Sequence, residues 1–285
     1  MAKAKQHYVP QSILRNFKFN PGSKNQSSKV FVLDKKENEV VTSNVKDIAC
    51  EKDYYNKNDS VKTNETDYDS FFDSLDSDIA PIICKIINNQ NIDCIDAGER
   101  EFLDKFTACQ YLRTPAIRKI AETLNCTDKD KIREYHAQAI TGSGSEISIL
   151  ESLATVFNKL QISLVEAHDD NQFIIGDSPV LHDPTANGIY FPISPKYCLF
   201  YHKGNNNPLN VVCINRLIFL ASENYIYGNT RKDLENVSNN LYGHQIDTFC
   251  TSQDSYWKCI LAYTDPSYCI NLFKNDIYEP LAKLL

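Results

Sequence analysis

The sequence has only nine glycines in 285 residues, and it lacks the short motifs that identify common nucleotide-dependent and metal-dependent enzymes. It contains no Walker loop, no Gly-x-Gly-x-x-Gly segment, no His-Glu-x-x-His motif and no Gly-x-Ser-x-Gly motif. With so few glycines, a loop that cradles phosphate through its backbone is hard to place. Kinases, P-loop NTPases, dinucleotide oxidoreductases and zinc proteases are therefore poorly supported as function classes.

Long apolar runs are also missing. No stretch approaches the roughly 20 uninterrupted apolar residues of a membrane helix, and no apolar segment follows the basic residues of the first ten positions. We therefore expect no membrane span, no secretory signal and a cytoplasmic protein. A composition of 42% hydrophobic and 24% charged residues is typical of a globular protein with ample material for a core.

Metal-binding spacings are absent as well. The ten cysteines are scattered, with no two closer than nine residues, and the six histidines form no His-x-x-x-His pair. Zinc ribbons need closely spaced Cys-x-x-Cys pairs. We expect reduced cysteines that pack as small apolar groups, and we predict no dedicated metal site.

Charge is distributed unevenly along the chain. Residues 1–36 hold eight Lys or Arg and one acid, whereas residues 37–104 hold seventeen acids and six bases. These segments form either two solvated faces of opposite charge or a local basic patch for a phosphate-bearing ligand. The net charge of −7 argues against a uniformly basic surface that coats nucleic acid.

The pattern of apolar residues predicts an α+β protein. Residues 30–33 and 40–42 flank a polar turn and predict an N-terminal β-hairpin. The middle of the chain has helical periodicity, with helices expected from Tyr68 to Ile87, from near Asp96 to Pro115, near 128–140 and near 145–159. Strands are expected after it at 161–165, 173–175, 189–191, 197–201 and 211–213, followed by a helix over 215–227.

These elements predict a helical middle segment packed with a strand-rich C-terminal half. We see no internal repeat and no clear linker in the sequence. We therefore predict one compact domain over residues 1–285, and a subdivision near 142–160 is the alternative.

The first candidate for a functional group is His7. It precedes Pro10, which suits the first turn of a helix because proline has no N–H to satisfy there. Ile13, Leu14 and Phe17 then give that short helix an apolar face. A histidine held rigidly at this point can exchange a proton near neutral pH, or it can simply pack against the helix.

The second candidate is a polar pair on the second long helix. Gln110 and Arg113 follow Phe102 and Phe106 at helical spacing, and Ile117 continues the same stripe. An unpaired guanidinium is costly to bury, so Arg113 must meet an acid, carbonyl groups or a ligand anion. Pro115 should kink the helix and open this face. The alternative is an internal salt bridge, for example to Asp76.

The third candidate is Asp177, which follows a buried strand and precedes Ser178 and Pro179. Functional groups often lie on rigid loops at strand ends. Asp177 can serve as a base, as a metal ligand or as a partner for His7 or Arg113. Its alternative role is to stabilise a local turn with its side chain.

These motifs together resemble the DUF4238 family, which is mostly prokaryotic and has no known function. The resemblance spans roughly residues 5–230, and it rests on residues 7–11, residues 14–17, Gln110 with residues 113–115, residues 176–179, residues 192–195 and Asn215. The family usually has serine where this chain has Gly176, and glutamate where it has Asp76. The resemblance implies that His7, Gln110, Arg113 and Asp177 form one site.

On this basis we hypothesise a nuclease-like hydrolase of phosphodiesters that belongs to a prokaryotic defence or toxin system. His7 would be the general acid or base, Arg113 would stabilise charge on phosphate, and Asp177 would orient His7 or hold a divalent cation, Mg²⁺ or Mn²⁺. Gln110, Arg15, Ser178 and Asn215 are predicted to bind the substrate.

Two other functions remain open. The protein can be a non-enzymatic sensor that binds a nucleotide or another small anion through Arg113 and Gln110. It can also be an interaction subunit of a larger assembly, in which case the polar stripe is only an internal ion-pair network. The expected partners are nucleic acid or a nucleotide, a second copy of the chain or another protein, and no membrane.

Overall fold

The computed structural model describes most of the first 242 residues. The described residues are 5–22, 27–52, 54–55, 68–115, 118, 136–137, 140–141, 149–168, 170–183, 188–204 and 207–242. The helix predicted near 128–140 lies outside them except at three positions, and Ile117 also lies outside them.

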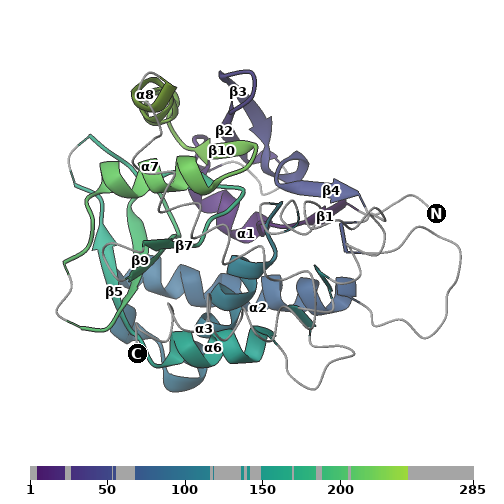
Figure 1. Cartoon of the computed structure of the whole chain (residues 1–285), viewed down its shortest axis with the longest axis vertical. Coiled ribbons are helices and arrows are strands. Elements are labelled where there is room, and N and C mark those ends of the chain that lie inside the picture. The colour runs from purple at the N-terminus through teal and green to yellow at the C-terminus, as the bar shows by residue number, and fades with distance from the viewer. Residues whose placement is uncertain are drawn as a thin grey trace, which may run out of the picture.

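The helices and strands follow one another in an α+β order, as predicted (Figure 1). The helices are α1 (Gln11–Leu14), α2 (Tyr68–Asn89), α3 (Ala97–Leu112), α6 (Ile149–Asn158), α7 (Val211–Ala221) and α8 (Arg231–Tyr242). The strands are β1 (Lys5–His7), β2 (Lys29–Asp34), β3 (Glu39–Asn44), β4 (Cys50–Lys52), β5 (Gln161–Glu166), β6 (Ile175–Gly176), β7 (Leu181–Asp183), β8 (Gly188–Pro192), β9 (Tyr197–His202) and β10 (Tyr225–Gly228).

The predicted N-terminal hairpin is confirmed as β2 and β3, which pair antiparallel. The side chain of Asp34 shapes its turn by accepting hydrogen bonds from the N–H groups of Lys36 and Glu37, at 2.9 and 3.1 Å. Asn38 completes the turn in the left-handed region, with φ of 52°. The hairpin continues into a four-stranded sheet in the order β3-β2-β10-β6, which joins the N-terminal segment to the later part of the chain.

A second sheet has the order β5-β9-β8-β7, and its described pairings are all antiparallel. Both faces of β8 and β9 are buried, which explains why these strands read as continuous apolar and aromatic runs. The rings of Tyr190 and Phe200 stack across them with centroids 4.7 Å apart. Gly188 is required beside this stack because a Cβ atom there would clash with the Phe200 ring.

Helices α2, α3 and α6 form the helical middle of the molecule and lie together in the lower part of Figure 1, with α1 above them. Asp96 begins α3 with a capping box, in which it accepts from the N–H of Glu99 while the Glu99 side chain accepts from the N–H of Asp96. No helix among the described residues is long and apolar enough to cross a membrane.

Three details of the predicted elements are wrong. Residues 211–213 begin helix α7 instead of forming a strand, because the side chain of Asn210 caps that helix by accepting from the N–H of Cys213 at 2.9 Å. The helix predicted over 215–227 ends at Ala221, and its last residues form part of β10. The expected strand at 173–175 begins only at Ile175.

The predicted kink at Pro115 is also wrong, because α3 ends before the proline is reached. The last residue of the helix is Leu112, and Arg113 is its C-cap residue, with φ of −87° and ψ of 29°. Proline restricts the residue before it to extended conformations. The approach of Pro115 therefore ends α3 at Leu112. Arg113 lies at the bend that follows the helix.

Candidate functional site

The short sheet of β1 and β4 holds His7 in place. The two strands pair antiparallel, so that His7 lies opposite Cys50. The N–H of Tyr8 extends the pairing by donating to the carbonyl oxygen of Ala49 at 2.9 Å. His7 is therefore part of a regular sheet and does not belong to a loose terminus.

Pro10 is the N-cap residue of α1, as the sequence predicts. The helix buries Ile13 and Leu14 completely, and this anchors the polar residues on its other side. Arg15 follows α1 and its Nη2 donates to Gln11 Oε1 at 2.7 Å. The Nε of Arg15 is buried and has no acceptor among the described residues.

Gln110 and Arg113 lie buried at the end of α3, and neither side chain is exposed. Gln110 Nε2 donates to the carbonyl oxygen of Tyr8 at 2.8 Å, and Gln110 Oε1 accepts from Arg113 Nε and Nη2 at 3.0 and 2.9 Å. The amide therefore links the residue that follows His7 to the guanidinium, which brings motifs separated by about a hundred residues into one cluster.

Arg113 also forms the ion pair that the sequence left open as an alternative. Its Nη2 donates to Asp76 Oδ1 at 2.5 Å, and its guanidinium lies between the rings of Phe72 and Phe106. Burial lowers the pKa of Arg113, but the charge and hydrogen bond of Asp76, together with the electrostatic effects of Tyr55 and Cys109, raise the pKa above its ordinary value. Arg113 Nη1 is nevertheless buried without an acceptor in the described structure.

A pocket of about 640 Å³ opens beside this cluster. His7, Arg15 and Asp76 line it, and it lies between β1, α1 and α2. Other polar residues of its wall are Lys5, Gln11, Ser12, Asp73 and Ser77. The pocket therefore combines an imidazole, two cationic side chains and two carboxylates, one of which is already neutralised by Arg113.

The imidazole of His7 is neutral at physiological pH. Burial, and to a smaller extent the positive charges of Arg113, Lys5 and Arg15, lower its pKa to about 4, whereas a hydrogen bond to the backbone of Lys46 opposes the shift. Nε2 is buried and has no partner among the described residues, so the bond to Lys46 belongs to Nδ1. This tautomer leaves the lone pair of Nε2 free to accept a proton.

Asp177 has a different environment from that of His7. Its carboxylate accepts hydrogen bonds from the N–H groups of Glu223, Asn224 and Tyr225 at 2.8, 2.7 and 3.1 Å, and so stabilises the turn between α7 and β10. Burial raises its pKa to about 6, and these backbone bonds act against the increase. Asp177 does not line the pocket, and it stabilises this distant turn rather than the local turn over Ser178 and Pro179 that was the alternative from the sequence.

Ser178 follows Asp177 directly in the sequence. Neither Ser178 nor Asn215 lines the pocket. Asn215 Oδ1 accepts from the N–H of Ile174, and its Nδ2 donates to the carbonyl oxygen of Gln172, so it fixes the segment that leads into β6. Ser178 Oγ is buried without a partner among the described residues. The structure thus brings His7, Arg15, Gln110 and Arg113 together, whereas Asp177, Ser178 and Asn215 do not line the pocket.

The packing around Gly176 explains why this chain has no serine at this position, where the family usually has one. A Cβ atom at this position would collide with the side chain of Ser222, whose Oγ donates to the carbonyl oxygen of Ile218 at 2.7 Å. Only glycine fits between β6 and this part of α7, so a serine is excluded here by packing.

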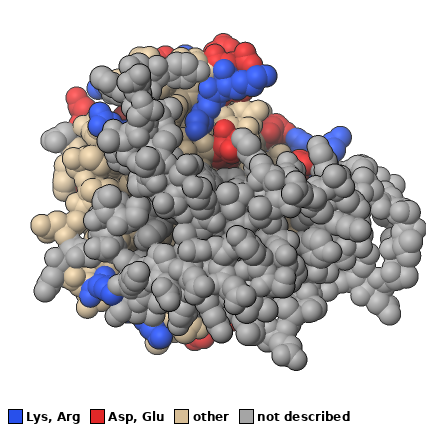
Figure 2. All heavy atoms as spheres, in the orientation of Figure 1, with Lys and Arg blue, Asp and Glu red and all other residues tan. Residues whose placement is uncertain are grey.

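In Figure 2, described Lys and Arg side chains near the top of the view lie next to Asp and Glu side chains. Two lysines of the basic N-terminal segment pair with acids, Lys5 with Asp47 at 2.7 Å and Lys36 with Glu37 at 3.5 Å. Within the described ranges, no three His, Cys, Asp or Glu residues are grouped so that they could hold a metal ion.

The sequence predicts no functional role for several residues of this region. Tyr55 and Phe72 line the pocket, and Arg118 is a second buried arginine beyond the end of α3. The only sequence signal for Arg118 is its position five residues after Arg113. Tyr55 follows a short strand that pairs with β1, a contact between distant segments that local periodicity does not reveal.

A family model described as a protein of unknown function, DUF4238, matches residues 5–232. No curated protein and no solved structure matches the chain. The match covers all residues of the pocket and of the Gln110–Arg113 cluster.

Proposed function

Since this chain belongs to the DUF4238 family, whose function is unknown, we propose from the site itself that the protein is a nuclease-like hydrolase of phosphodiesters. One observation carries the proposal. His7 and Arg15 line the same open pocket, and each has a buried nitrogen without a partner among the described residues. A phosphate oxygen or an attacking hydroxyl group would supply these missing partners.

His7 is proposed to act as the general base. A neutral imidazole with a free Nε2 can take a proton from water or from a hydroxyl group of the substrate. Its low pKa of about 4 keeps it in this form at neutral pH, although it also makes the group a weak base. The positive charges that lower the pKa are those that would attract a phosphate to the same place.

Arg15 is proposed to contact the phosphate directly, while Arg113 acts from behind the pocket wall. The guanidinium of Arg15 is held by Gln11, and a preorganised donor stabilises the charge that develops on phosphate oxygens. Asp76 and Gln110 fix Arg113, so its role is to position Asp76 and to maintain a positive potential near His7. In this proposal Asp177 supports the fold and does not take part in the reaction.

The experiment is a cleavage assay of the full-length protein on DNA, RNA and tRNA, each with Mg²⁺, with Mn²⁺ and with chelator. Cleavage that is lost in His7→Ala and in Arg15→Ala, but kept in the exposed-residue controls His168→Ala and Arg216→Ala, is the expected result. Intact substrates under all three conditions would contradict the proposal. Product formation in chelator would show that the divalent cation is unnecessary.

A second candidate function is a non-enzymatic binding module for a nucleotide or another small anion. It is favoured by the environment of Asp177, whose carboxylate is occupied by three backbone N–H groups and leaves His7 without a carboxylate partner from that loop. A thermal-shift screen with nucleotides distinguishes the two functions. Stabilisation by a nucleotide that mass spectrometry recovers unchanged supports binding without hydrolysis.

We further propose that the activity serves a defence or toxin system in the cytoplasm of a prokaryote. Expression of the wild-type chain in a bacterial host should slow growth or reduce phage plating, and His7→Ala should abolish this effect at equal protein levels. Equal growth and equal plating with both chains would contradict this context without affecting the biochemical proposal.

A further inference from the structure

Arg118 is a buried guanidinium beyond the end of α3, and it is only 6% exposed. Its guanidinium carbon lies 3.3 Å from the centroid of the Tyr54 ring. Its Nη2 donates to the carbonyl oxygen of Tyr54 and lies 3.3 Å from His136 Nδ1. The side chain is thus held by an aromatic ring, a carbonyl group and an imidazole.

Most of the donors of this guanidinium are unused. Nε carries one N–H and Nη1 carries two, and both atoms are buried without an acceptor among the described residues. No described carboxylate forms an ion pair with Arg118. Burial of a cation without a counter-charge is strongly unfavourable, so this arrangement favours an anion beside Arg118.

The two neighbouring side chains do not supply that negative charge. His136 Nε2 lies 2.9 Å from the carbonyl oxygen of Leu112; because a carbonyl group can only accept, Nε2 carries the proton and Nδ1 presents its lone pair to Arg118. Burial and the charge of Arg118 lower the pKa of His136 to about 3, so the ring is neutral. Burial also raises the pKa of Tyr54, which keeps its hydroxyl group protonated.

Further donors without partners surround the same interior region. Arg113 Nη1 and the hydroxyl groups of Tyr54 and Tyr55 are buried and unpaired within the described chain. The rings of Tyr54 and Tyr55 lie edge to face with their centroids 4.8 Å apart, and the guanidinium of Arg118 lies over the Tyr54 ring. Donors that approach from several sides suit the tetrahedral oxygens of phosphate better than the two coplanar oxygens of a carboxylate.

We propose that Arg118, Tyr54 and His136 form a second, internal binding site that takes a phosphate group, either as inorganic phosphate or as the terminal phosphate of a nucleotide. None of these three residues lines the pocket beside α1, so the site is distinct from the proposed catalytic pocket. It does not depend on hydrolysis in that pocket, and it holds its ligand beside a fixed guanidinium without a chemical step.

The test is a calorimetric titration of the full-length protein with inorganic phosphate and, separately, with AMP, against chloride at equal ionic strength. Saturable binding is expected in the wild type. Arg118→Lys, which keeps the charge but loses the planar set of donors, should raise the Kd by on the order of tenfold. Arg216→Lys, at an exposed arginine of α7, is the matched control, and its Kd for inorganic phosphate should stay within about twofold of the wild-type value. Comparison of the Kd for inorganic phosphate with the Kd for AMP then shows whether the site takes a free phosphate or the phosphate of a nucleotide.

The proposal is overturned if the wild type shows no saturable binding of either ligand, or if Arg216→Lys weakens phosphate binding as much as Arg118→Lys does. If Arg118→Lys does not fold, Tyr54→Phe removes only one hydroxyl group and should raise the Kd by about threefold; an unchanged Kd then overturns the proposal. Loss of nucleic-acid cleavage in His7→Ala with normal phosphate binding would separate this site from the proposed hydrolysis.

Discussion

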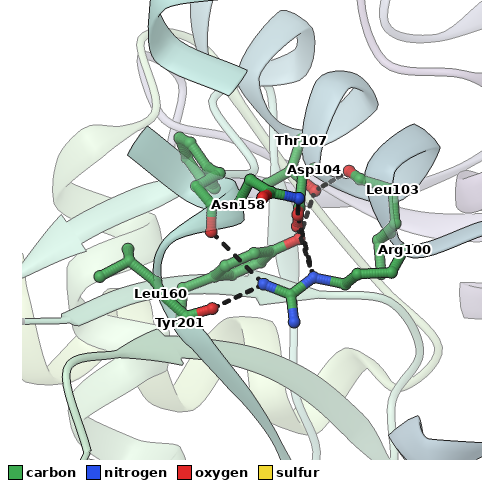
Figure 3. Close-up of polar contacts among 8 residues, drawn as sticks. Arg100, Leu103, Asp104, Thr107, Asn158, Leu160 and Tyr201 are labelled. Atoms are coloured by element: carbon green, nitrogen blue, oxygen red, sulfur yellow. Dashed lines mark hydrogen bonds and ion pairs between the residues drawn. The ribbon is translucent and has the colours of Figure 1, made fainter. Parts of the chain in front are cut away.

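The two ends of helix α3 each carry an arginine–carboxylate pair, but only the N-terminal pair has no buried polar atom without a partner among the described residues. At the N-terminal end, Arg100 Nε donates to both oxygens of Asp104 at 2.9 Å, and Arg100 Nη2 donates to the carbonyl oxygen of Leu160 at 2.6 Å (Figure 3). Asn158 Nδ2 adds a further bond to Asp104 at 3.2 Å. This network fixes α3 to the end of α6.

At the C-terminal end, Arg113 is more deeply buried but less completely paired. Asp76 and Gln110 occupy its Nε and Nη2, whereas Nη1 has no acceptor among the described residues. His7 and Arg15 nearby each have an unpaired buried nitrogen too. Buried polar groups in proteins are normally paired, so the fully paired end serves the fold and the end with unused groups is the one suited to a ligand.

The largest expected difference between the two ends is in activity. His7→Ala should lower the rate of phosphodiester cleavage by about 10²-fold or more, because general acid–base groups contribute effects of that size. Asp104→Asn should leave the rate per folded molecule unchanged, because that carboxylate does not line the pocket. Single-turnover cleavage assays, corrected for the folded fraction by circular dichroism, provide the measurement. Equal rates in both variants would remove the functional distinction between the two ends.

The next largest effect is expected from Asp76→Asn. Removing this carboxylate leaves the fully buried Arg113 without a counter-charge, and breaking such a pair lowers the free energy of unfolding by about 3 kcal/mol. Urea denaturation measures the change through the midpoint at an unchanged slope. Asp78→Asn on the same helix is the control, since Asp78 is exposed and contacts only Ser74 among the described residues. Similar losses in both variants would show that Arg113 does not depend on the pair.

Asp104→Asn should cost less, about 2 kcal/mol, because Arg100 is partly exposed and water screens its charge. The same urea experiment measures this loss. If Asp104→Asn proves more destabilising than Asp76→Asn, the completeness of hydrogen bonding matters more than burial of the charge. That result would sharpen the contrast between the two ends, since it would identify the Arg100–Asp104 network as the main structural one.

Much of the fold could be predicted from the sequence, because the period of the apolar residues is a local property. The hairpin of β2 and β3 and the helices α2 and α3 occur where the pattern predicts them. The segment 211–213 was predicted incorrectly because a short β-branched run has no period of its own. There the side chain of Asn210 decides the outcome by capping a helix.

The candidate site was predictable in part for a related reason. Buried polar residues at helical spacing identified Gln110 and Arg113, and the rigid segment before Pro10 identified His7. The position of Asp177 relative to them depends on the pairing of β6 with β10, which sequence spacing cannot reveal. Its three backbone partners lie about 46 to 48 residues away along the chain, so its turn-stabilising contacts could only be found in three dimensions.

The smallest expected effect is a pH dependence of stability that reports on the burial of His7. Its folded-state pKa is about 4, below the ordinary value of 6.5. Between these two values the unfolded chain binds a proton at this imidazole and the folded chain does not. The free energy of unfolding therefore falls as the pH decreases from 6.5 towards 4.

The experiment compares the free energy of unfolding at pH 7.5 and pH 5.8 in the wild type and in His7→Gln. The wild type should lose about 1 kcal/mol more than the variant over this interval. Asp177, with its raised pKa of about 6, changes the free energy of unfolding in the opposite direction. His136, with its low pKa of about 3, changes it in the same direction as His7. Both residues are present in the two proteins, so their effects cancel in the difference. His168→Gln, at an exposed histidine, should behave as the wild type does. A difference of zero between wild type and His7→Gln would mean that His7 is protonated as readily as in the unfolded chain, and that the cationic groups around the pocket do not hold it neutral.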